Sequence, residues 1–331
     1  MEKSDLRIVF FGTSDFGCPT LDTLLLNQFN VVGVVTKPDF YNPRKKRLEP
    51  TPIKEKALQL GIPVLEPTDL KSKDFQAKLG ALNGNVFVVI AYQMIPKEVY
   101  SMAKYGAFNI HASLLPNYRG AAPINWAIAN GESRIGMTSF FLNEKMDDGD
   151  IICQMSVPNY SNRNFSQMYQ ILSEGVCGGL CCKTLNQIVT ENGETSRYKQ
   201  NPYGYSLLHF KQAPKLNRWN TRLDFSKDVK TVFNHIKAFA DKPGAWCFIS
   251  SEDKHNGKAL KILGGEIISF CDKPKEKYVG RLTIYDSNEI FLQCSNGTIN
   301  VKKIQLEGCR VMTPKDFING YGSILSNWIL E

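Results

Sequence analysis

The sequence lacks the patterns that mark several common classes of protein. Its nine cysteines are odd in number and include no Cys-x-x-Cys pair, so neither a disulfide framework nor a common zinc site fits. It has no Gly-x-Gly-x-x-Gly dinucleotide fingerprint. No apolar run approaches the roughly eighteen residues of a membrane span, and the first residues resemble neither a signal peptide nor a transit peptide. We therefore expect a soluble cytoplasmic protein.

The composition is that of an ordinary globular protein, with 43% hydrophobic and 22% charged residues, and 331 residues suffice for two domains. The charge is uneven. Residues 208–331 contain 19 Lys+Arg and 13 Asp+Glu, whereas residues 1–207 contain 21 and 19. A basic C-terminal part indicates a polyanionic partner such as RNA, although so modest an excess is equally compatible with plain solubility.

The hydrophobic pattern divides the chain into two regions of different character. In residues 1–202, apolar strands alternate with helical stretches, which predicts an α/β domain with a Rossmann-like, mostly parallel sheet. Residues 203–216 are polar and irregular, and we interpret them as a linker. Residues 217–331 contain one amphipathic helix and then several short strands separated by turn signals, which predicts a small OB-like β-barrel.

The strongest functional signal lies at the end of one predicted strand, residues 107–111. Asn109 and His111 are two residues apart, so both side chains leave the same face of this strand. Pro116, Gly120 and Pro123 keep the following segment irregular, and open α/β sheets bind ligands at the carboxyl ends of strands. An amide donor beside an imidazole suits the stabilisation of an oxygen that becomes negative when a carbonyl is attacked.

Such a site also needs a carboxylate that holds the imidazole and assists removal of a proton. Asp147 and Asp148 follow a predicted strand, residues 136–142, and either carboxylate is a candidate. A single histidine at a strand end is more often a structural residue, so the bare residues leave both interpretations open.

Four short motifs in this order resemble the signature of the folate-dependent formyltransferases. They are Asn109-x-His111, Ser113-Leu-Leu-Pro116, Tyr118-Arg-Gly-Ala-Ala-Pro-Ile124 and Asp147-x-Gly149-Asp150. The Arg-Gly-Ala-Ala-Pro-Ile form is most similar to the members that act on tRNA. The resemblance extends over nearly the whole chain and is strongest over residues 1–160.

The resemblance implies the formyltransferase fold and a specific reaction. The formyl group of 10-formyltetrahydrofolate would pass to the α-amino group of methionine on initiator tRNA, without a metal, in a protein that we expect to be a monomer. Asn109 and His111 would stabilise the oxyanion, and Asp147 would orient His111; a role for Asp148 stays open. The folate co-substrate would be bound by four consecutive residues: Ser113, Leu114, Leu115 and Pro116.

A basic segment between two predicted elements offers a second candidate site. Residues 37–52 contain four prolines and predict a long exposed loop. Within it, Phe40 and Tyr41 precede four consecutive cations, Arg44, Lys45, Lys46 and Arg47. Such residues grip phosphates and stack on bases, although a solvated loop is the commoner outcome. The resemblance implies that this loop enters the acceptor arm of the tRNA and that Arg44 matches an arginine used there.

Two alternatives share parts of this pattern. A folate formyltransferase acting on a nucleotide sugar or another small amine would have the same Asn-x-His and Asp residues, while the basic loop and the β-rich C-terminal region favour tRNA. A non-catalytic RNA-binding module is disfavoured because the three candidate catalytic residues, Asn109, His111 and Asp147, are all present.

Overall fold

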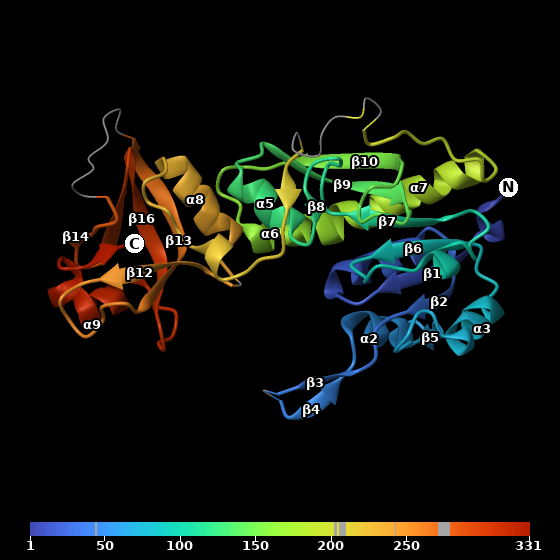
Figure 1. The fold of residues 1–331 in the computed structure, drawn as a ribbon, viewed down its shortest axis with the longest axis horizontal. Coiled ribbons are helices and arrows are strands. Elements are labelled where there is room, and N and C mark those ends of the chain that lie inside the picture. Colours follow the sequence, from blue (N-terminus) through green and yellow to red (C-terminus); the bar gives the residue numbers. More distant parts are fainter. Residues whose placement is uncertain (44, 202–203, 205–209, 242, 271–278) are drawn as a thin grey trace. The chain divides into compact units, whose positions relative to one another are not determined.

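The computed structural model describes residues 1–43, 45–201, 204, 210–241, 243–270 and 279–331. The chain forms two compact units. The first comprises Met1–Gly120, Ile135–Val157 and Tyr169–Gln212, and the second comprises Ala121–Arg134, Pro158–Met168 and Ala213–Glu331 (Figure 1). Much of the predicted linker lies outside the described residues, so the predicted domain boundaries stay a prediction.

The first unit is built on a seven-stranded sheet in the order β10-β9-β7-β6-β1-β2-β5. Neighbouring strands from β7 through β6, β1 and β2 to β5 are parallel, whereas β9 runs antiparallel to β7. The mostly parallel α/β sheet is thus confirmed. The strands are β1 Arg7–Gly12, β2 Asn30–Val35, β5 Val64–Leu65, β6 Val86–Ile90, β7 Ala107–His111, β9 Arg134–Phe141 and β10 Ile151–Pro158.

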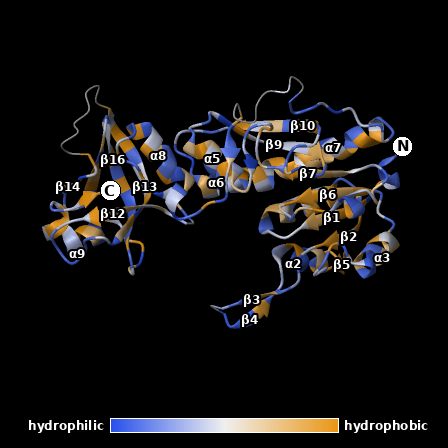
Figure 2. Ribbon diagram, viewed as in Figure 1, coloured by the Kyte–Doolittle hydropathy of each residue, from blue (hydrophilic) through white to orange (hydrophobic). Residues whose placement is uncertain are grey.

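The central strands consist mostly of buried hydrophobic residues, as expected for a sheet that is covered by helices. All five residues of β6 are buried, as are five of the six in β1, and Figure 2 shows β1, β2 and β6 mainly in the hydrophobic colour. Parallel strands with both faces covered read as continuous apolar runs. The helices are α1 Cys18–Leu26, α2 Pro52–Gln59, α3 Lys73–Ala81, α4 Lys97–Tyr100 and α7 Gly178–Thr190. The short helix α6, Phe165–Gln170, begins in the second unit and ends in the first.

Local signals explain where these helices begin. The side chains of Thr51 and Ser72 accept hydrogen bonds from the backbone N–H groups of Lys54 and Phe75, both at 3.2 Å, which caps α2 and α3. The hydrophobic pattern of residues 164–191 predicts one long helix, and the chain is helical without interruption from Phe165 to Thr190. A π-helical segment, Ile171–Cys177, joins α6 to α7. Gly175 within it weakens regular helix geometry.

The segment predicted as a long exposed loop contains a β-hairpin. Strands β3 (Phe40–Asn42) and β4 (Arg47–Glu49) pair antiparallel, with Tyr41 opposite Leu48. The hairpin extends away from the sheet of the first unit (Figure 1), and its side chains are mostly exposed, as predicted. Arg44 lies outside the described residues.

The second unit contains a six-stranded sheet in the order β14-β15-β16-β13-β12-β17. Every pairing described for it is antiparallel. A bridge between Arg281, just before β14, and Ile329 of β17 joins the two edges, so the sheet curls upon itself. The strands are β12 Ala245–Ser250, β13 Ala259–Phe270, β14 Leu282–Asp286, β15 Glu289–Cys294, β16 Gly297–Leu306 and β17 Ile329–Leu330.

Helices complete this unit. Asp228 caps α8 (Val229–Ala238) by accepting the backbone N–H of Thr231 at 3.0 Å. The side chain of Asn125, in α5 (Pro123–Ala129), donates to the carbonyl of Ala238 at 2.7 Å. A further helix, α9 (Pro314–Leu325), follows residue 313, where the sequence pattern predicts no element. Two further short strands, β8 Arg119–Gly120 and β11 Gln212–Ala213, pair with each other. Among the described residues, no helix combines the length and apolarity that crossing a membrane requires.

Candidate active site

The candidate site is built on β7, an interior strand of the first unit. Asn109 pairs with Val89 on one side and Phe140 on the other, and His111, the last residue of β7, lies opposite Thr138. The side chain of His111 is buried, and Asn109 is half-buried. Backbone pairing therefore holds Asn109 from both sides and His111 from the side of β9.

One nitrogen of His111 is committed to the backbone. Its Nε2 lies 2.8 Å from the carbonyl oxygen of Tyr118. A carbonyl only accepts hydrogen bonds, so Nε2 carries the hydrogen and donates it. In neutral imidazole, Nδ1 then has the free lone pair. This Nδ1 lies 3.8 Å from Oδ2 of Asp147, a distance longer than a direct hydrogen bond.

The two candidate carboxylates point to different partners. Oδ2 of Asp147 accepts the backbone N–H of Gly120 at 3.0 Å and faces His111. Asp148 instead forms an ion pair with Arg119 at 2.5 Å. The backbone of Asp147 is left-handed, with φ +51°, a conformation that aspartate tolerates better than most residues. The geometry thus brings Asp147 to the histidine and holds Asp148 on the arginine.

A glutamine that sequence reasoning missed braces the Asp147 loop. Gln200, which is buried, donates from Nε2 to the carbonyls of Asp147 at 2.9 Å and Gly149 at 2.8 Å. Its Oε1 accepts from Nε and Nη2 of Arg119 at 3.0 and 2.7 Å. Arg119 thereby connects Gln200 to Asp148. No motif in the sequence singles out Gln200, because it follows the loop by more than fifty residues.

Gly149 is required by close packing within the same loop. A Cβ at this position would lie 1.6 Å from the carbonyl oxygen of Phe141. Any other residue would therefore displace the loop that carries Asp147.

The segment predicted to bind folate is partly occupied by internal contacts. Ser113 is buried and its hydroxyl donates to the carbonyl of Asn117 at 2.8 Å. Leu115 is also buried; its N–H donates to Oγ1 of Thr138 at 3.1 Å and its carbonyl accepts from Gln154 at 2.9 Å. The other two residues of this segment, Leu114 and Pro116, are half-buried.

The basic hairpin carries its charge on its exposed side chains. Lys45 and Arg47 pair with Glu49 at 2.7 and 3.2 Å, and Asn42 donates to the same carboxylate at 2.7 Å. These donors, first of all Lys45, lower the pKa of Glu49 to about 2. Lys46, at φ +53°, forms no ion pair with any described residue.

The hairpin also exposes apolar surface. Tyr41 and Leu48, which face each other across the two strands, are 60% and 65% exposed, and Phe40 is 48% exposed. Exposed aromatic rings beside exposed cations suit a ligand that has both phosphates and flat bases.

Comparison with known proteins identifies the family. A family model described as formyl transferase matches residues 6–175, and one described as the formyl transferase C-terminal domain matches residues 215–322. The methionyl-tRNA formyltransferase of Flavobacterium johnsoniae is 37% identical over 320 residues, which cover 97% of each chain.

Solved structures share the fold at lower identity. An N-formyltransferase from Helicobacter canadensis, in complex with folinic acid and dTDP-3-aminofucose, matches with a TM-score of 0.61 and 20% identity over 89% of this chain and 98% of its own. HypX from Aquifex aeolicus matches with a TM-score of 0.60 and 17% identity over 97% of this chain. The match covers 48% of HypX, which is the longer protein. At these identities the likeness concerns the fold alone. Because both family models match and the relative above is similar over nearly its full length, the chain belongs to the formyl transferase family, among the methionyl-tRNA formyltransferases.

Proposed function

We propose that this protein transfers the formyl group of 10-formyltetrahydrofolate to the α-amino group of methionine on initiator tRNA. The observation that carries the proposal is the placement of Asn109, His111 and Asp147 around one strand end, with the free Nδ1 of His111 turned to Asp147. Relatives of nearly the same length carry the corresponding name.

In this reaction the amine nitrogen bonds to the formyl carbon, and the bond from that carbon to N10 of the folate breaks. The amine loses one proton and N10 gains one. Because Nε2 of His111 is occupied by Tyr118, only Nδ1 can take or return this proton. Asp147 stabilises the imidazolium that forms, directly after a small movement or through a water molecule.

The formyl oxygen becomes negative while the amine is attacked. Asn109 donates an amide N–H to this oxygen, and His111, once protonated at Nδ1, adds a second donor. The amide never changes charge, and the pairing of β7 with both neighbours keeps it in place. The backbone that carries Asn109 is therefore fixed before the substrates bind.

We propose that folate binds beside Ser113, Leu114, Leu115 and Pro116. The internal bonds of Ser113 and Leu115 support a rigid segment, while the half-buried Leu114 and Pro116 offer apolar surface to a flat ring.

The RNA partner is proposed to meet the hairpin and the second unit. Exposed Lys45, Lys46 and Arg47, together with Arg44, would contact phosphates. The curled antiparallel sheet supports an OB-like barrel, a fold that often binds oligonucleotides.

A transfer assay tests the proposal. Purified protein receives labelled 10-formyltetrahydrofolate with methionyl initiator tRNA, with free methionine or with a nucleotide amino sugar. We expect label on the tRNA alone. Label on the sugar would instead favour a formyltransferase that acts on nucleotide sugars. The Helicobacter canadensis fold neighbour is solved with such a sugar, dTDP-3-aminofucose.

A further inference from the structure

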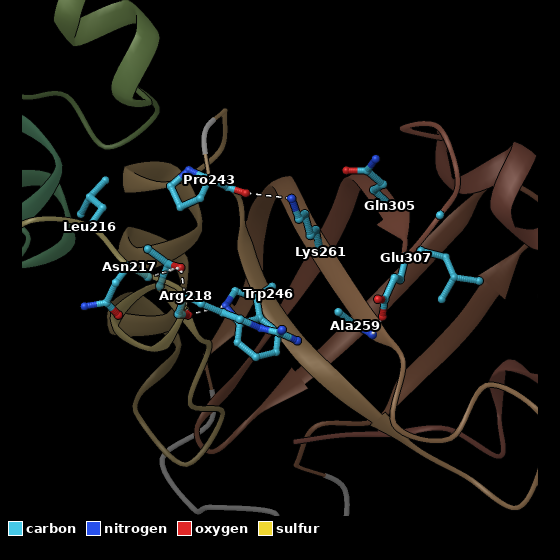
Figure 3. Close-up of a pocket in the computed structure, with 12 residues that line it drawn as sticks. Leu216, Asn217, Arg218, Pro243, Trp246, Ala259, Lys261, Gln305 and Glu307 are labelled. Atoms are coloured by element: carbon cyan, nitrogen blue, oxygen red, sulfur yellow. Dashed lines mark hydrogen bonds between the residues drawn. The ribbon is translucent and has the colours of Figure 1, made fainter. Parts of the chain in front are cut away.

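The second unit contains a cavity of about 450 Å³ that plays no part in the proposed function. Figure 3 shows Leu216 and Asn217 on one side of it, Gln305 and Glu307 on the other, and Trp246 between them. Its volume falls in the range of small-molecule sites. None of its lining residues belongs to the proposed active site or to the basic hairpin.

Two cations line the cavity, and the described residues supply neither of them with a carboxylate partner. The guanidinium of Arg218 lies over the rings of Trp246 at 4.7 Å and Phe248 at 5.7 Å. The ring of Trp246 is itself fixed, because its Nε1 donates to the carbonyl of Arg218 at 2.6 Å. Among described residues no acid pairs with Arg218 or with Lys261, which donates to the carbonyl of Pro243 at 2.8 Å. Both positive charges are thus held in place and available to an anion.

The opposite wall offers hydrogen-bond acceptors. Oε2 of Glu307 accepts the backbone N–H of Ala259 at 2.8 Å, which orients the carboxylate and leaves Oε1 for a ligand. Nε2 of Gln305 donates to the carbonyl of Cys309 at 2.8 Å, which leaves its Oε1 as an acceptor. A ligand that satisfies this wall must carry N–H or O–H donors.

We propose that this cavity binds a 5′-mononucleotide. The phosphate meets Arg218 and Lys261, the ribose hydroxyls donate to Glu307, and the base lies along the apolar wall that includes Leu216. A carboxylate that accepts from ribose hydroxyls is a familiar arrangement in nucleotide sites. A bare phosphate would satisfy the cations but leave the acceptors and most of the volume unused.

Calorimetric titration of the full chain with 5′-AMP tests this proposal. We expect saturable binding of one AMP per chain, with adenosine and inorganic phosphate each binding more weakly. Arg218→Gln should weaken AMP binding roughly ten- to hundredfold, because it removes a charge-assisted hydrogen bond. The matched control is Arg222→Gln: Arg222 lies over the ring of Phe248 at 5.5 Å but does not line the cavity, so AMP should bind this variant as it binds the wild type.

A second variant keeps the test decisive if Arg218→Gln does not fold. Lys261→Met retains the aliphatic stem and removes the charge, and it should also weaken AMP binding. The proposal is overturned if AMP does not bind at millimolar concentrations, if Arg218→Gln and Arg222→Gln behave alike, or if Lys261→Met leaves AMP binding unchanged. Equal affinity for phosphate and AMP would show that the cavity binds anions without recognising the nucleoside, which would also overturn the proposal. If the wild type does not bind AMP and Arg218→Gln loses tRNA binding, Arg218 is an RNA contact and the mononucleotide proposal is wrong.

Discussion

The strand-end site and the basic hairpin both carry charge, but they are held in opposite ways. His111 and Asp147 have side chains only 9% and 11% exposed, and bonds from Tyr118, Gly120 and Gln200 fix them. In the hairpin, the side chains of Lys45 and Arg47 are 58% and 68% exposed, and both pair with Glu49 within the same hairpin.

This difference matches two kinds of task. Stabilising a transient oxyanion requires donors that need no reorganisation when charge develops. Contacting a phosphate backbone requires charge that reaches the partner, and the gain comes largely from released counterions rather than from one geometry. Changes in the first region should therefore alter turnover, and changes in the second should alter affinity and its dependence on salt.

The largest effect is expected for Asp147→Asn, which removes the negative charge facing Nδ1 of His111. We expect kcat to fall roughly 10²- to 10⁴-fold, the range of general acid–base contributions. Single-turnover kinetics with methionyl-tRNA would measure it. The matched variant Asp148→Asn alters the ion pair with Arg119 instead and should lose far less. Equal losses in both variants would contradict the assignment of Asp147.

A smaller effect is expected for Gln200→Leu, which leaves the carbonyls of Asp147 and Gly149 without their donor. We expect the free energy of unfolding to fall by about 1–3 kcal/mol. Turnover should fall roughly ten- to hundredfold, because the loop shifts relative to His111. Denaturant unfolding and the transfer assay measure the two effects.

Gln187→Leu is the matched control for this prediction. Gln187 donates to a single carbonyl, that of Ser196 at 3.0 Å, away from the Asp147 loop. Turnover that falls equally in both variants would show that Gln200 does not position Asp147 specifically.

In the hairpin, replacing Arg44, Lys45, Lys46 and Arg47 by alanine should weaken tRNA binding and leave kcat at saturating tRNA nearly unchanged. The slope of log affinity against log salt should fall by roughly 0.9 for each cation that contacts a phosphate. Filter binding at several salt concentrations measures this slope. A variant in which the four exposed lysines Lys71, Lys73, Lys78 and Lys104 are replaced by alanine controls for net charge. An unchanged slope would show that the hairpin is not part of the RNA interface.

The smallest effect concerns the protonation of Glu49. Its pKa is lowered from 4.5 to about 2, first by the hydrogen bond from Lys45. Because the folded-state pKa is depressed, pairing favours the hairpin above pH 4.5, and this contribution is lost as the pH falls toward 2. NMR titration of the carboxyl carbon should give a midpoint near the lower value in the wild type. Lys45→Ala should raise that midpoint, whereas Lys46→Ala should not.

Local patterns predicted much of the fold. The buried strands and the α/β alternation are confirmed because they depend on the periodicity of hydrophobic residues within short stretches of the chain. The hairpin was missed because each of its strands has only three residues, too few to show alternation, and because Pro43 and Pro50 are typical of a loop. The helix α9 was missed although Thr313 caps it by accepting the N–H of Asp316 at 3.2 Å.

The sequence by itself determined that Asn109 and His111 share one face of a strand, because side chains alternate with a period of two. It also identified a nearby pair of aspartates, but it could not choose between them. Only the tertiary structure decided that Asp147 faces His111 and that Asp148 pairs with Arg119. That choice depends on the left-handed backbone at Asp147 and on hydrogen bonds from Gln200. These contacts join residues far apart in the chain, and no local pattern encodes them.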